Sequence, residues 1–469
     1  MGVADAGTNV DLLALHERFP DRYPILLESV SGAETLGRTD VLFALPGEKL
    51  TQRSDGSLAG ATPRQVPGRF LDSLDAWFAS ENGARHEGGP TSARLTEPVG
   101  PPGQCRHAFS AGWFLYLGYE LAQEVEPVLR LPRSPLPRAV AWRMRGAIVR
   151  DRRSGAIEVC AENDALRQVL EPQLAADLAT LRTEAPRAVP VRLATGVTEQ
   201  APEIFRDGVG EVLEAIARGD IYQANLSRSW RAQLAGGANA SDLYRALRRA
   251  NPAPFAAIAE LGDLAVLSSS PERLLELRDG IASTRPIAGT RPRGVDAAAD
   301  AALKRELRLN EKEQAEHVML VDLERNDLGR ICRGGTVEVD EYMTIETYAT
   351  VHHIVSNVRG RLRDDVTPGR AIAAVFPGGT ITGCPKVRCM QILAGLEREP
   401  RDAYTGSLGS LGLAGLMDLN ILIRTLTLRD GEIGFRTGAG IVADSVPEAE
   451  LAETRAKARG ILLALGEGT

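Results

Sequence analysis

LAVLSSSPERLLEL, at residues 264–277, is the stretch that decides the fold class, because its short apolar runs follow the periodicity of β-strands. GIASTRPIAG (280–289) and GEIGFRTGAGIVAD (431–444) have the same character and begin at glycines that indicate turns. Helical spacing of apolar residues instead predicts helices over 303–330 and 447–466. No period repeats along the chain, which excludes a solenoid or propeller. These patterns predict a large α+β domain with many strands.

Two parts of the chain differ in composition. Residues 141–162 have the pattern of a β-hairpin, and residues 164–181 have apolar residues at helical spacing. A segment rich in Pro and Ala follows and predicts a linker at 186–203. We therefore divide the chain into an N-terminal region, 1–185, and a C-terminal region, 204–469.

Composition excludes several functions. The chain has 469 residues with 55 Lys and Arg against 62 Asp and Glu, a formal charge of −7, whereas nucleic-acid binding requires a basic surface. No long uncharged apolar run and no signal peptide is visible, so the expected location is the cytoplasm, with no membrane partner. Five scattered cysteines without a CxxC motif predict neither a disulfide framework nor a zinc site.

Two sets of carboxylates share helical faces. Glu450, Glu453 and Lys457 are spaced i, i+3 and i+7, and Glu313 and Glu316 lie three residues apart on the preceding predicted helix. Spacing alone fits a solvated ion-pair face. It equally permits carboxylates from two helices to hold Mg²⁺, a hard cation that takes oxygen ligands.

Histidines and glycines mark two further positions. His352 and His353 are adjacent in a predicted strand, so their side chains point to opposite faces and cannot bind one ion. Gly438 and Gly440 lack the third glycine of a dinucleotide fingerprint. Their backbone N–H groups remain accessible to a small carboxylate ligand, because glycine has no Cβ.

The C-terminal region strongly resembles the chorismate-binding enzymes, which include anthranilate, aminodeoxychorismate, isochorismate and salicylate synthases. Seven motifs occur in order: SSSPERL (268–274), RPIAGTRPRG (285–294), EHVMLVDLERNDLGR (316–330), VHHIVSNVRG (351–360), FPGGTITGCPK (376–386), MDLNILIRT (417–425) and GAGIVADSVPEAELAET (438–454). The resemblance implies a large two-sheet antiparallel β-sandwich with helices packed outside and a Mg²⁺-dependent site. It also implies a partner, a glutamine amidotransferase subunit, because no glutaminase nucleophile motif is present.

The resemblance assigns roles to residues at matching positions. Glu316 and Glu453 match the Mg²⁺ ligands, with Glu313 and Glu450 close by, and Glu272 matches the general acid at the departing C4 hydroxyl of chorismate. The residues that match substrate-binding positions are Thr380, Tyr404, Arg424, Gly438, Gly440 and Lys457. Thr380 and His353 match residues that line the ring, and Thr290 is a further candidate catalytic residue in the PIAGT motif.

Two positions separate the activities within the family. Gln223 stands where the water-using synthases resemble one another in having a lysine, so ammonia is the expected nucleophile. Ala288 stands in PIAGT where most aminodeoxychorismate synthases have a lysine that forms a covalent adduct, and alanine is usual in anthranilate synthases. Five other features resemble aminodeoxychorismate synthases: YQANL (222–226), PER (271–273), FPGG (376–379), MDLN (417–420) and GWFLYLGYELAQEVEP (112–127).

The sequence therefore predicts an aminodeoxychorismate synthase subunit that makes 4-amino-4-deoxychorismate, the precursor of 4-aminobenzoate and folate, through a non-covalent 2-amino-2-deoxyisochorismate. Anthranilate synthase component I is the alternative, and a non-catalytic tryptophan-binding homologue is a third. A tryptophan-like pocket is expected from LLES and NPAPF, at Leu27, Glu28, Ser29, Asn251, Pro252 and Phe255.

Overall fold

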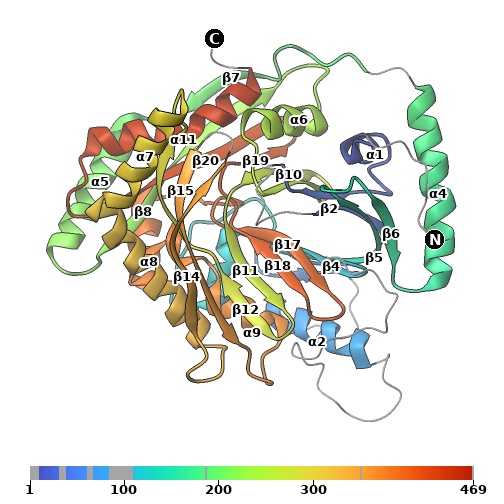
Figure 1. The fold of residues 1–469 in the computed structure, drawn as a ribbon, viewed down its shortest axis with the longest axis horizontal. Coiled ribbons are helices and arrows are strands. Elements are labelled where there is room, and N and C mark those ends of the chain that lie inside the picture. The colour runs from blue at the N-terminus through green and yellow to red at the C-terminus, as the bar shows by residue number, and fades with distance from the viewer. Residues whose placement is uncertain are drawn as a thin grey trace.

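The computed structural model describes residues 10–30, 39–60, 67–83, 109–184, 187–348 and 351–466, which form an antiparallel β structure with helices outside (Figure 1). The helices are α1 (Leu12–Arg18), α2 (Phe70–Gly83), α3 (Ala122–Val125), α4 (Asp164–Thr183), α5 (Pro202–Ala217), α6 (Ala240–Ala250), α7 (Ala297–Leu309), α8 (Glu311–Gly329), α9 (Pro368–Val375), α10 (Lys386–Glu397) and α11 (Pro447–Leu465), with 3₁₀ turns η1 (Tyr119–Leu121) and η2 (Gly379–Ile381). None of these described helices has the length and apolar character needed to cross a membrane.

The strands pair in one continuous antiparallel order. They are β1 (Ile25–Glu28), β2 (Thr39–Gln52), β3 (Leu58–Ala59), β4 (Gly112–Leu117), β5 (Ala139–Asp151), β6 (Ile157–Ala161), β7 (Ala194–Glu199), β8 (Gln223–Leu234), β9 (Phe255–Glu260), β10 (Leu264–Ser270), β11 (Arg273–Arg278), β12 (Ile281–Thr284), β13 (Ile287–Pro292), β14 (Glu338–Thr347), β15 (Val351–Arg361), β16 (Gly383–Cys384), β17 (Ser407–Gly412), β18 (Met417–Asn420), β19 (Thr425–Arg429) and β20 (Glu432–Ile441). The main order is β7-β8-β20-β19-β10-β9-β1-β2-β5-β4-β17-β18-β11-β12-β15-β14. Strands β3, β6, β13 and β16 pair with β2, β5, β15 and β8.

The long β2–β5 pair joins the two halves of this sheet. The first half runs from β7 to β1 in the strand order, and the second half runs from β4 to β14. The first part of β2 pairs with β1, and the first part of β5 pairs with β4, so opposite ends of the pair belong to opposite halves. A register shift between Pro46 and Lys49 interrupts the pair, and Leu45 just before it has a φ of 53°. Such irregularities bend a strand, which allows the halves to face each other.

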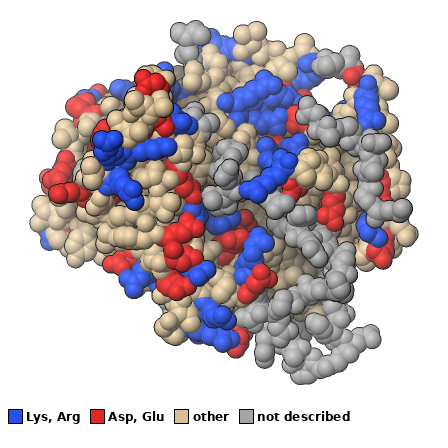
Figure 2. Space-filling view, viewed as in Figure 1, with Lys and Arg blue, Asp and Glu red and all other residues tan. Residues whose placement is uncertain are grey.

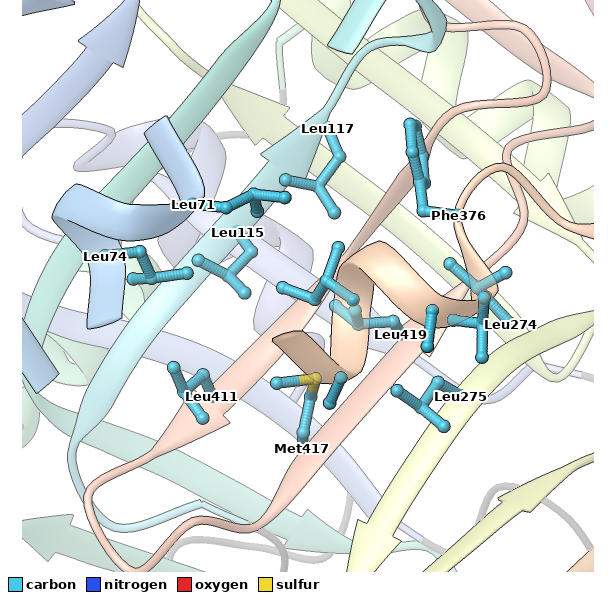
Figure 3. Packing of buried hydrophobic residues seen from close by; sticks show 14 of the residues in the cluster. Leu71, Leu74, Leu115, Leu117, Leu274, Leu275, Phe376, Leu411, Met417 and Leu419 are labelled. Carbon is cyan, nitrogen blue, oxygen red and sulfur yellow. The ribbon is translucent and has the colours of Figure 1, made fainter. Parts of the chain in front are cut away.

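Alternation along β4 places side chains in two cores. Phe114 and Tyr116 pack with residues of β1, β2, β5, β9 and β10 between the halves. Leu115 and Leu117 point the other way, toward Leu71 and Phe376 and the helices α2, α8, α9 and α10 (Figure 3). A third cluster packs α1, α4, α6 and α11 on the outer face of the first half. The sandwich predicted for this chain is therefore confirmed, with hydrogen bonding that continues from one half to the other.

The structure corrects three details of the sequence analysis. The helix expected over 303–330 is two helices, because Asn310 caps α8 by accepting a hydrogen bond from the Glu313 N–H at 3.0 Å. The predicted linker contains β7, which pairs with β8; the division of the chain at 186–203 stays a prediction. Cys160 is disulfide-bonded, which sequence spacing could not indicate because pairing depends on distance in the fold. Lys and Arg side chains and Asp and Glu side chains are interspersed on the face shown in Figure 2.

Leu115 offers a test of the core. It is fully buried, so we expect Leu115→Ala to lower the free energy of unfolding by about 2–5 kcal/mol, the cost of lost apolar burial plus a cavity. Urea denaturation followed by circular dichroism measures the change. Leu309→Ala, at a position 68% exposed, is the control and should change stability by less than about 0.5 kcal/mol. Equal effects of the two substitutions would contradict the assigned packing.

Candidate active site

Glu272 lies at the turn between β10 and β11, and its side chain is buried. The Thr380 hydroxyl, on η2, donates a hydrogen bond of 2.7 Å to Glu272 Oε1. Burial raises the pKa of Glu272 to about 7, although the hydrogen bond from Thr380 and the charges of Lys457 and Arg424 oppose the rise. The carboxyl group therefore retains its proton at slightly acidic to neutral pH, as a general acid requires.

Arg424 is a half-buried cation that lacks an acidic partner. It precedes β19 with a φ of 52°, and its Nη1 donates to Asn251 Oδ1 at 3.3 Å. Among the described residues, no carboxylate lies within ion-pair distance of this guanidinium, and burial lowers its pKa. A charge that is partly removed from water without a partner is costly, and a guanidinium binds carboxylates through parallel hydrogen bonds. The position is suited to an anionic ligand.

The two histidines of β15 have different surroundings. His352 Nε2 lies 2.9 Å from Asp300 Oδ1 on α7, so this histidine stabilises the fold. His353 Nδ1 lies 2.9 Å from the Thr290 hydroxyl, and burial together with the charge of Arg424 lowers its pKa to about 4. His353 is therefore a neutral ring near the Arg424 guanidinium. The opposite orientation predicted for the adjacent pair is confirmed.

A second group of polar side chains lies on β8 against the glycines of β20. A Cβ at position 440 would lie 2.6 Å from Gln223 Nε2, and one at position 438 would lie 2.5 Å from the Tyr404 hydroxyl. The glycines therefore make room for these side chains. Gln223 Oε1 is buried without a hydrogen-bond partner, and burial raises the pKa of Tyr404 to about 12, which keeps its hydroxyl protonated.

Contacts and electrostatic effects connect these residues into one site. Lys457 Nζ donates to the Gly438 carbonyl at 3.1 Å and also acts on Glu272. Arg424 acts on both Glu272 and His353. The predicted residues joined in this way are Gln223, Glu272, Thr290, His353, Thr380, Tyr404, Arg424, Gly438, Gly440 and Lys457. Ala288 is half-buried on β13, where it pairs with Ile354.

The four predicted metal ligands are divided between α8 and α11. Glu313 Oε1 lies 3.2 Å from Arg291 Nη1, and Glu453 Oε1 lies 2.7 Å from Lys457 Nζ. Glu450 is buried. No cluster of three or more His, Cys, Asp or Glu suited to a metal occurs in the described part of the chain. The carboxylates have the oxygen donors that Mg²⁺ prefers, but a cation here would need further ligands from the substrate.

Arg401 holds several parts of the site together, and sequence reasoning missed it. It is 2% exposed and forms a buried ion pair with Glu397, with N–O distances of 2.7 and 2.9 Å. Its other hydrogen bonds go to the carbonyls of Asn225 and Ile381 and to the Thr405 hydroxyl. Arg401 thereby fixes β8, η2 and the segment that carries Tyr404. Nothing in a single sequence separates this arginine from the many on the surface.

Three of the six residues predicted for a tryptophan-like pocket line one cavity. A cavity of about 300 Å³ is lined by Leu27, Glu28 and Phe255, together with Arg273 and Asp418. The other three predicted residues, Ser29, Asn251 and Pro252, do not line this cavity, and Asn251 instead contacts Arg424. Asn251 therefore lies beside a residue of the candidate active site.

A larger cavity, of about 530 Å³, lies farther along the same face of β8, β19 and β20. Tyr404 and Thr425 form its boundary with the candidate active site, and Arg231, Glu399 and Arg429 lie among its charged lining residues. The other predicted site residues lie outside it.

Comparison with known proteins identifies the family. Residues 62–463 match the family model described as chorismate binding enzyme. The chain is 36% identical to anthranilate synthase component 1 of Pseudomonas aeruginosa over 99% of this chain and 94% of the relative. It is 43% identical to an aminodeoxychorismate synthase of Streptomyces griseus over 76% of this chain and 50% of that protein. The structure of anthranilate synthase component I from Streptococcus pneumoniae superposes with a TM-score of 0.76 and 31% identity, covering 90% of this chain and 92% of that one.

These matches, taken with the fold and the site, place the chain in the family of chorismate-binding enzymes. It is therefore an enzyme of a family that acts on chorismate, and its fold is that of anthranilate synthase component I. Relatives of both names, aminodeoxychorismate synthase and anthranilate synthase, are similar to it, so the family alone leaves the product open.

Glu272 gives a pH-dependent prediction. If its protonated carboxyl is the acid, kcat/KM for chorismate falls about tenfold for each pH unit above its pKa of about 7, because the proton-donating form is lost as pH rises. The measurement is a pH profile with free ammonia held constant. Glu272→Gln should lose roughly 10²- to 10⁴-fold in kcat and lack this alkaline limb. A retained limb in the variant would assign it to another group.

Proposed function

We propose that this chain is the chorismate-binding subunit of an aminodeoxychorismate synthase, which converts chorismate and ammonia to 4-amino-4-deoxychorismate and water. The observation that carries the proposal is the buried Glu272 carboxyl, whose pKa burial raises to about 7, in the same site as the unpartnered Arg424 guanidinium. An acid that can protonate a departing hydroxyl is thus combined with a binding group for a carboxylate. Motifs such as YQANL and MDLN favour this product over anthranilate.

The reaction begins with ammonia adding at C2. Ammonia forms the C2–N bond, the ring double bonds shift, and the C4–O bond breaks as Glu272 protonates the hydroxyl, which leaves as water. The proton lost by the added nitrogen restores Glu272. A second ammonia then attacks C4 of the 2-amino-2-deoxyisochorismate and loses a proton, while the C2 amine takes a proton and departs as ammonia. The net change is one hydroxyl replaced by one amine.

Arg424 and Tyr404 hold the enolpyruvyl carboxylate in this proposal. The guanidinium supplies the charge, and the protonated Tyr404 hydroxyl supplies a neutral donor. Gln223 stands in place of a lysine, so no side-chain amine is available there to activate water. Thr290 and the neutral His353 line the ring.

Mg²⁺ is the proposed cofactor. Glu316 and Glu453 would hold it, with Glu313 and Glu450 nearby, and the bound ion would neutralise the ring carboxylate and withdraw charge as the hydroxyl leaves. Lys457, which is paired with Glu453, would assist in binding the same carboxylate. Ammonia would come from glutamine through a separate amidotransferase subunit, the partner proposed here.

Anthranilate synthase is the second candidate, and Ala288 is the observation that favours it. No covalent C2 adduct can form at position 288, because alanine has no nucleophile. The proposed route through free 2-amino-2-deoxyisochorismate accommodates this alanine, since ammonia replaces the lysine amine.

The decisive experiment identifies the product. The purified chain is incubated with chorismate and ammonium, with and without Mg²⁺ and an aminodeoxychorismate lyase, and the products are separated by chromatography. We expect 4-aminobenzoate only when both Mg²⁺ and the lyase are present. Anthranilate and pyruvate formed without the lyase would overturn the proposal in favour of anthranilate synthase. Tryptophan binding without turnover of chorismate would indicate a non-catalytic homologue.

Position 288 provides an independent test of the non-covalent route. We expect Ala288→Lys to give an adduct of chorismate that intact-protein mass spectrometry detects, and the unaltered chain to give none. Ala288→Met is the control, because it adds a side chain of similar length without an amine. An adduct on the unaltered chain would contradict the proposed route.

A further inference from the structure

Asn225 is a polar side chain in the candidate site to which no role has been given above. It lies two residues after Gln223 on β8, so both side chains point to the same face of the sheet. A Cβ at position 438 would lie 2.5 Å from Asn225 Oδ1, the same distance as from the Tyr404 hydroxyl. The absent side chain of Gly438 thus lets Asn225 and Tyr404 meet at one point.

The hydrogen bonds of Asn225 leave its amide nitrogen available. The Tyr404 hydroxyl lies 3.5 Å from Oδ1, and the backbone of Asn225 is held by the Thr382 carbonyl and the Arg401 guanidinium. Nδ2 donates to no other residue in the described part of the chain, and the residue is half-buried rather than enclosed. Two N–H donors therefore remain beside Tyr404 with their backbone fixed.

We propose that Asn225 determines the product by donating from Nδ2 to the enolpyruvyl carboxylate that Tyr404 and Arg424 hold. This inference rests on the proposed function. The competing reaction of 2-amino-2-deoxyisochorismate removes the proton from C2 and breaks the C3–O bond, and the departing enolpyruvate takes up a proton to give pyruvate and anthranilate. Departure of that group breaks its hydrogen bonds to the protein, so an added donor retains it.

A valine at position 225 would isolate the effect of the hydrogen bond from that of side-chain size. Valine is close to asparagine in size but has no hydrogen-bonding group. A hydrogen bond to a charged group corresponds to roughly one to two factors of ten in an equilibrium constant, which is enough to change the ratio of two products.

Asn225→Val tests the inference through the product ratio. With chorismate, ammonium and Mg²⁺, we expect the ratio of anthranilate plus pyruvate to 4-amino-4-deoxychorismate to rise about tenfold or more, and KM for chorismate to rise. Asn225→Asp keeps the size and removes both donors, so it should also raise KM and the ratio. Gln233→Val, at the far end of the same strand, is the matched control for stability and turnover.

The outcomes separate this inference from the proposed function. A ratio unchanged within twofold in Asn225→Val, at retained thermal stability and turnover, would overturn the role of Asn225. If Asn225→Val does not fold, Asn225→Asp gives the same decision from the ratio. Anthranilate as the main product of the unaltered chain would instead overturn the proposed function, and an unchanged KM in both variants would then also reject the hydrogen bond from Asn225.

Discussion

The buried ion pair between Arg401 and Glu397 is the constraint on which the candidate site depends. Burial alone would raise the pKa of Glu397. The charges of Arg401 and Arg436 outweigh this effect and hold the pKa below its ordinary value, so the carboxyl group remains ionised inside the protein. Glu397 also accepts hydrogen bonds from the Ser227 backbone and hydroxyl on β8. The pair therefore connects a helix end, a strand and the Tyr404 segment. Removing either partner would leave an unpaired buried charge, the costly arrangement that natural cores avoid.

The active groups are arranged in the opposite way, since no ion pair keeps both partners charged. Arg424 has no acidic partner among the described residues, and burial favours the neutral forms of Glu272 and His353. The unpaired Arg424 charge is costly by itself and becomes favourable when an anionic substrate binds. The contrast follows from the surroundings: Glu397 faces two guanidinium groups, whereas Glu272 faces one threonine hydroxyl and more distant cations. Two buried glutamates in one fold thereby have different protonation states.

Periodicity predicted some of the strands and helices, among them the strands within 264–277 and 431–444 and the helix α11. Motif resemblance predicted the residues of the site that the structure joins. The features that the sequence could not predict depend on distances across the fold. Asn310 divides one expected helix into two because its side chain competes for a backbone N–H. Asn251 was expected in the tryptophan-like pocket but accepts a hydrogen bond from Arg424, a contact that sequence spacing cannot indicate. Asn225 could have been found from the sequence, because residues two apart on a strand share a face and Gln223 was already placed there.

Alanine at position 288 and asparagine at position 225 belong to different parts of the sheet. Position 288 lies on β13, which pairs with β15, whereas position 225 lies on β8, which pairs with β7, β16 and β20. The two residues share no strand pairing, so one can change without repacking the other. Position 288 is proposed to decide whether an amine of the protein attacks C2, and position 225 whether the enolpyruvyl group stays. In this proposal the identity of the residue at 288 does not by itself determine the product.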